Sequence, residues 1–102
     1  MVDELVDITV GWCDEFAEHW PGVASMGRPL RKSGDSPFAT SVETYSRGEF
    51  LSYGEETLRR LLKHYRAMAA RGVNLHERIV ESEMRLMGIE SLEHAEKLVK
   101  RA

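Results

Sequence analysis

Histidine and carboxylate side chains occur in two pairs whose spacing could bind a metal ion. Glu15 precedes His19 by four residues and Glu90 precedes His94 by four, so each pair would share one helix face. Two such pairs on facing helices could form a zinc site. A di-iron bundle would need a Glu three positions before a His, and none of the four His residues has one. A His–carboxylate metal-dependent protein is therefore one hypothesis, but such pairs are common on helix surfaces, so we assign no metal ligand and no cofactor.

Residue types that serve as nucleophiles lack a catalytic context in this chain. Cys13 lies beside Trp12 and Phe16 on the apolar side of the predicted first helix, where a thiol is typically an inert packing group. Most serines lie in loops and helix caps, none has a G-x-S-x-G pattern, and no glycine-rich phosphate loop follows a predicted strand. The sequence therefore gives no catalytic residue and no support for an enzyme.

Basic side chains within residues 53–71 could bind nucleic acid. Arg59, Lys63 and Arg66 fall along one stripe of the predicted helix, and such a stripe can contact phosphates. Further basic residues are available nearby: Arg60, Arg71, Arg28, Arg31 and Lys32. Residues 71–73 are similar to the tight turn of a helix-turn-helix, but the helix that follows carries three Glu residues that would repel phosphates. Nucleic-acid binding is therefore an alternative rather than the favoured function.

The predicted helix at residues 75–87 carries two apolar stripes about 120° apart. One stripe consists of Leu75, Ile79 and Leu86, and the other consists of Val80, Met84 and Met87. A helix with two apolar stripes needs two partners, and Met-rich stripes are typical of adaptable contact surfaces. We therefore predict that the second stripe binds another protein. The alternative is a helix that is simply buried on two sides within one bundle.

The first predicted helix, residues 3–20, is amphipathic and purely acidic. Its acids fall on one stripe, no Lys or Arg precedes Arg28, and its apolar face is wide enough to need more than one neighbour. Pro21 ends this helix because proline restricts the residue before it. Residues 21–37 hold three prolines and three glycines and predict a flexible loop.

Local signals delimit the remaining helices, predicted near residues 53–71, 75–87 and 91–101. The capping residues are Ser52 with Glu55 for the first, Asn74 for the second and Ser91 for the third, and the terminating glycines are Gly72 and Gly88. Short connections between these helices predict that consecutive helices pack as neighbours.

Residues 38–51 are compatible with two structures. Apolar residues at helical spacing favour a short helix that Ser36 caps, with Pro37 at its first position. The β-branched, alternating character of the same stretch also fits a hairpin that closes at Arg47-Gly48. We favour the helix.

Size and composition describe a single globular domain. The chain has 102 residues, 42% of them hydrophobic and 30% charged, and a net charge of −3 that by itself implies no partner. A lone cysteine cannot form an internal disulfide, so we expect the cytoplasm. Acids interrupt the first apolar residues and no basic region precedes them, so we expect neither a signal peptide nor a membrane span.

We therefore predict an all-α protein, a small bundle of four main helices forming one domain over residues 1–102, with the ambiguous segment at 38–51. Its predicted core residues are Leu5, Trp12, Phe16, Leu58, Leu61, Leu62, Tyr65, Ile79, Leu86 and Leu92. The favoured function is a non-catalytic accessory or regulatory protein that acts through protein–protein contacts. A chain this short often completes its core by self-association, so we include a homodimer among these contacts.

The predicted partner-binding residues are Val80, Met84, Met87, Arg59, Lys63 and Arg66. The acidic stripe of 3–20 and the basic stripe of 53–71 each lie opposite an apolar face. Two helices that share one core should therefore keep these stripes apart, and we expect them to pair only between chains.

Overall fold

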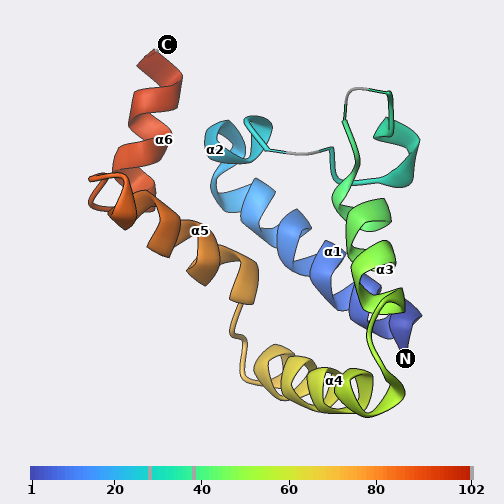
Figure 1. Ribbon diagram of the computed structural model, residues 1–102. Coiled ribbons are helices and arrows are strands. Elements are labelled where there is room, and N and C mark those ends of the chain that lie inside the picture. The colour runs from blue at the N-terminus through green and yellow to red at the C-terminus, as the bar shows by residue number, and fades with distance from the viewer. Residues whose placement is uncertain (28, 38, 102) are drawn as a thin grey trace.

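The computed structural model describes residues 1–27, 29–37 and 39–101, and this part of the chain is helical (Figure 1). Its elements are α1 (Val2–His19), α2 (Pro21–Ser25), a 3-10 turn η1 (Lys32–Gly34), α3 (Val42–Leu51), α4 (Glu55–Ala70), α5 (Leu75–Leu86) and α6 (Leu92–Arg101). The prediction of a small all-α bundle is confirmed. Among the described residues, no helix combines the length and the hydropathy needed to cross a bilayer.

Helix α1 is the central element of the fold. It packs against α2, α3, α4 and α5, whereas α6 packs mainly on α2 and touches the end of α5. Figure 1 shows α1 in the middle, with α4 at one end of the molecule and α6 at the other. The wide apolar face of α1 is thus covered by several neighbours, as its sequence predicts.

Buried residues form two clusters along α1. The first joins the N-terminal half of α1 to α3 and α4 and consists of Leu5, Val6, Val10, Phe50, Leu58 and Leu62. The second joins the C-terminal end of α1 to α2 and α6 and consists of Phe16, Val23, Leu92 and Ala95. Six predicted core residues are buried: Leu5, Trp12, Phe16, Leu58, Leu62 and Leu92. Leu61 and Tyr65 are half-buried and pack against the first cluster.

Two predicted core residues lie on the surface instead. Ile79 is 48% exposed and Leu86 is 88% exposed. The cause is the rotation of α5 about its own axis, which turns the stripe with Val80 and Met84 toward the second cluster. The periodicity identified both stripes but not which one faces the chain.

Most predicted helix boundaries are correct. Asn74 accepts a hydrogen bond from the Glu77 amide at 3.0 Å, and Ser91 accepts one from the His94 amide at 3.1 Å. Gly72 and Gly88 have φ of 72° and 83°, the left-handed conformation expected after a helix.

The predicted cap at Ser52 is wrong. The Ser52 hydroxyl donates to the Glu49 carbonyl oxygen at 2.5 Å, so this residue closes the end of α3. Helix α4 begins after Gly54, which offers no side-chain cap. The error arose because α3 extends to Leu51 and uses Ser52 as its own C-cap.

Helix α3 settles the choice at 38–51 in favour of a helix, and the hairpin alternative is wrong. Its N-cap is Ser41, which accepts a hydrogen bond from the Thr44 amide at 3.1 Å, and not Ser36 as predicted. Ser36 instead forms an isolated bridge with Ala39. Phe38, the first residue of the predicted range, lies outside the described residues.

The predicted loop at 21–37 contains more structure than its composition indicates. Residues 21–25 form α2, because Pro21 occupies the first helical turn, where its missing amide hydrogen costs least. The Asp35 carboxylate accepts hydrogen bonds of 2.6 Å from the Ser41 amide and the Thr44 hydroxyl, which anchors this segment to α3. Arg28, part of the predicted basic cluster, lies outside the described residues.

Candidate binding groove between α1, α2 and α5

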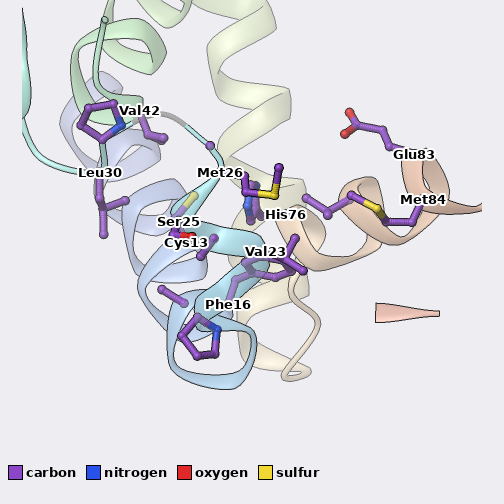
Figure 2. A pocket seen from close by; sticks show the side chains of 16 residues that line it. Cys13, Phe16, Val23, Ser25, Met26, Leu30, Val42, His76, Glu83 and Met84 are labelled. Carbon is purple, nitrogen blue, oxygen red and sulfur yellow. The ribbon is translucent and has the colours of Figure 1, made fainter. Parts of the chain in front are cut away.

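A groove with a volume of about 770 Å³ runs between α1, α2, α5 and the start of α3. Its walls are mostly apolar and include Phe16, Val23, Met26, Leu30, Val42, Val80 and Met84. Figure 2 shows the Met26, His76 and Met84 side chains near one another, with Glu83 at the edge of the group. Apolar grooves of this size with a few polar groups are the usual form of a binding site.

Helix α1 contributes Cys13 and Phe16 to the groove. Phe16 is buried, and its ring packs edge-on against the His76 ring, with the two centroids 5.0 Å apart. Burial, together with the charge of Asp14, raises the pKa of the Cys13 thiol to about 11. The thiol is therefore protonated at neutral pH and is not an activated nucleophile.

Helix α5 contributes Val80 and Met84, two of the predicted partner-binding residues, to the opposite wall. Asn74 positions this helix: besides capping it, its side-chain amide donates to the Trp12 carbonyl oxygen of α1 at 2.8 Å. Met87, the third member of the predicted stripe, is 66% exposed and does not line the groove.

Polar side chains inside the groove carry little charge at pH 7. Burial lowers the pKa of His76, and the nearby Glu83 carboxylate only partly opposes that effect. The imidazole is therefore neutral at pH 7. Glu83 is exposed and supplies negative charge at the rim.

Glu96 of α6 holds helix α2 in place. The Glu96 carboxylate is buried and accepts hydrogen bonds of 2.8 Å from the Gly22 amide and from the Val23 amide. Burial raises the pKa of Glu96, but the two amides and the charge of Lys100 outweigh it, so the pKa lies below its ordinary value. Sequence reasoning missed this cap because Glu96 is more than seventy positions from the helix end that it caps.

A family model described as "Protein of unknown function (DUF4125)" matches residues 1–97. The chain belongs to the DUF4125 family. The matched range contains every residue that lines the groove, and Glu96 as well. Comparison with curated proteins and with solved structures gives no match.

The basic stripe of this DUF4125 chain lies on α4, away from the groove. Arg59 pairs with Glu55 at 2.7 Å within the helix, and Arg66 pairs with Glu4 of α1. The expectation that the acidic and basic stripes pair only between chains is therefore wrong. Long side chains at the flanks of two packed helices reach each other around the shared core, which the helical-wheel argument overlooked.

The two His–carboxylate pairs of this DUF4125 chain do not come together. Within residues 1–27, 29–37 and 39–101, no group of three or more His, Cys, Asp or Glu side chains could hold a metal ion. Glu15 and His19 therefore do not share a site with Glu90 and His94, as the zinc hypothesis requires.

Proposed function

We propose that this protein is a non-catalytic accessory or regulatory protein that binds a helical segment of another protein in the groove between α1, α2 and α5. The observation that carries the proposal is the groove itself: α1, α2 and α5 supply most of its walls, the segment after α2 and the start of α3 supply the rest, and most of the side chains there are apolar. The thiol of Cys13 is protonated and the His76 ring is neutral at pH 7. A surface of this composition favours binding of another protein over catalysis.

An amphipathic helix with a basic residue beside its apolar face fits the groove. Helix-in-groove binding places apolar side chains of the partner between helices of the receptor. Met26 and Met84 lie in the walls, and methionine adapts its shape to varied partners. The Glu83 carboxylate at the rim would pair with a Lys or Arg of the partner and set the direction of the bound helix.

The basic stripe offers a weaker case for nucleic-acid binding. Arg59 and Arg66 are already paired with carboxylates of the same chain, so their charge is partly neutralised before any phosphate arrives. Lys63 is the remaining member of the predicted stripe. If the stripe bound nucleic acid, a mobility shift would be strong at low salt, weaken steeply with salt and disappear in an Arg59→Ala, Lys63→Ala variant.

Selection of amphipathic helices from a displayed peptide library on the full chain tests the proposal. The selected peptides should shift the methyl NMR signals of Met26 and Met84 and leave that of Met68 on α4 unchanged.

Met84→Lys should weaken peptide binding by about tenfold or more, because it places a charge in an apolar contact. Met87→Lys is the matched control, because Met87 is exposed outside the groove, and it should bind as the wild type does. Peptides that bind Met84→Lys as well as the wild type would contradict the proposal. A fatty acid that shifts the same methyl signals when no peptide does would make the groove a small-molecule site instead.

A further inference from the structure

The face of α5 that carries Ile79 and Leu86 is left uncovered by its own chain, whereas Leu75 at its start is half-buried. Leu75, Ile79, Ser82 and Leu86 follow one another at intervals of four, three and four residues, the spacing of a coiled-coil seam. Ile79 and Leu86 are exposed, and Ser82 is exposed between them. The stripe of α5 with Val80, about 120° around the helix, packs toward the second buried cluster.

The overall dimensions agree with an incompletely covered core. The Cα radius of gyration is 14.6 Å, whereas a compact domain of this length has a radius near 13 Å. Contiguous exposed apolar surface is typical of sites where proteins associate. A second copy of the chain carries the same seam and is therefore a candidate to cover it.

Charges beside the seam favour a second copy of the chain as the partner and a parallel orientation of the two α5 helices. Arg78 lies on one flank and Glu83 on the other, in the positions that flank a coiled-coil seam. When two such helices run parallel, each Arg78 faces the partner's Glu83, five positions later. Antiparallel pairing would instead set Arg78 near the partner's Arg85 or bring the two Glu83 carboxylates together. Within the described residues, neither Arg78 nor Glu83 has an ion-pair partner in its own chain.

We propose that two copies of this chain associate through α5, with the two helices parallel about a twofold axis. Ile79 and Leu86 pack against their counterparts, and Arg78 of each copy pairs with the partner's Glu83. Because Glu83 also lines the groove, the partner's Arg78 then lies at the groove rim, and the second copy borders the binding site.

The seam is short, so the dimer should be weak. Helix α5 has 12 residues, and a seam of that length buries less than the roughly 1,200 Å² of a standard stable interface. We therefore expect association only at high protein concentration. This surface shares Glu83 with the groove but includes neither Val80 nor Met84, so the inference does not depend on the proposed function. In the dimer, the partner's Arg78 takes the place at Glu83 of the basic residue expected from a bound helix.

Sedimentation equilibrium of the full chain over a range from micromolar to several hundred micromolar tests the association. The average mass should rise from 11.6 kDa toward twice that value. Leu86→Glu should hold the protein at the monomer mass, and its circular dichroism should be unchanged because Leu86 is exposed. Leu51→Glu, at an exposed leucine of α3, is the matched control and should associate as the wild type does.

Charge exchange and cross-linking test the direction. Arg78→Glu alone and Glu83→Arg alone should each weaken association by about tenfold, and the double variant should recover it. In a parallel pair each Leu86 faces its counterpart, whereas in an antiparallel pair centred near Ser82 the two Leu86 side chains lie at opposite ends, so Leu86→Cys should form a disulfide-linked dimer under mild oxidation. Wild type, whose Cys13 is buried, and Ser52→Cys should not.

A mass that stays at 11.6 kDa at every concentration would overturn the inference. So would equal loss of association in Leu51→Glu and Leu86→Glu, or a double charge variant that remains a monomer. Loss of peptide binding in Met84→Lys, with association unchanged, would separate the groove from the α5 seam.

Discussion

Glu96 illustrates how one carboxylate can join two helices that are distant in sequence. It caps α2 from α6, and its position leaves no room beside the chain at Gly22: a Cβ there would lie 2.9 Å from Glu96 Oε2. Glycine at this position thus serves close approach rather than an unusual backbone angle, because a larger residue would push the Glu96 carboxylate away from the amides that it caps.

Gly22→Ala should destabilise the fold by about 1–3 kcal/mol, because the added methyl group must displace the carboxylate that caps α2. Gly48→Ala is the matched control. Its Cβ would meet nothing within 4 Å in the middle of α3, so alanine should stabilise the helix by about 0.5–1 kcal/mol. Urea unfolding followed by circular dichroism measures both changes. Equal effects at the two glycines would contradict this account of Gly22.

The contribution of Glu96 should depend on pH in a defined direction. Its pKa in the folded protein lies below the ordinary value of 4.5, so the unfolded chain binds this proton more readily than the folded one. The stabilisation is fully present above the unfolded pKa and is lost as the pH falls through the folded pKa. The stability difference between wild type and Glu96→Gln should therefore be large at pH 7 and shrink below about pH 4.

Unfolding midpoints at pH 7 and pH 3 measure this difference. Glu93→Gln, an exposed change in the first turn of the same helix, is the control, and it should lower stability at pH 7 only by the roughly 0.3–1 kcal/mol that an exposed acid at a helix N-terminus contributes. A difference for Glu96→Gln that is the same at both pH values would show that its charge does not contribute.

At the scale of elements, the sequence predicts the features that depend on residues close together in the chain and misses those that depend on distant residues. The cap of α5 by Asn74 and the left-handed Gly72 are set by residues within a few positions, so both were predictable. The cap of α2 depends on a contact between distant residues, and no local pattern reveals it. Val80 and Met84, predicted as partner-binding residues, line the groove, but the groove itself and its α1 and α2 walls were not foreseen, because only packing brings them together.

Asn74 links α5 to α1 through the oxygen and the nitrogen of its side-chain amide. Its oxygen caps α5, and its nitrogen donates to the Trp12 carbonyl oxygen of α1. Asn74→Ala loses both bonds and should destabilise the protein by about 2–3 kcal/mol. Asn74→Ser keeps a capping oxygen and loses only the bond to α1, so it should cost about 1–2 kcal/mol.

Urea unfolding of the two Asn74 variants separates the capping bond from the bond between helices. Ser91→Ala is the control for a cap alone, because the Ser91 bond to the His94 amide is exposed, and it should cost about 1 kcal/mol. If Asn74→Ser is as stable as the wild type, the bond to Trp12 does not help to hold α5 on α1.

At the scale of the whole molecule, the two buried clusters differ in size and are joined mainly through α1. The cluster between α1, α3 and α4 contains six buried hydrophobic residues, whereas the cluster that holds α2 and α6 contains four. Helix α6 packs mainly on α2, a helix of five residues, and touches α5. Local stability follows buried apolar contact, so the α2–α6 end should open more readily than the rest of the molecule.

Amide hydrogen exchange should therefore show stronger protection in α1 and α4 than in α6. Glu96→Gln should speed exchange in α2 and α6 and leave α3 and α4 unchanged, because it removes a cap that lies within the smaller cluster. Glu93→Gln on the exposed side of α6 again serves as the control. Equal protection of α4 and α6, or faster exchange throughout the chain in Glu96→Gln, would mean that the two clusters unfold as one cooperative unit. In that case the groove wall formed by α2 would be as stable as α1 itself, and a partner would meet a preformed site rather than one that opens locally.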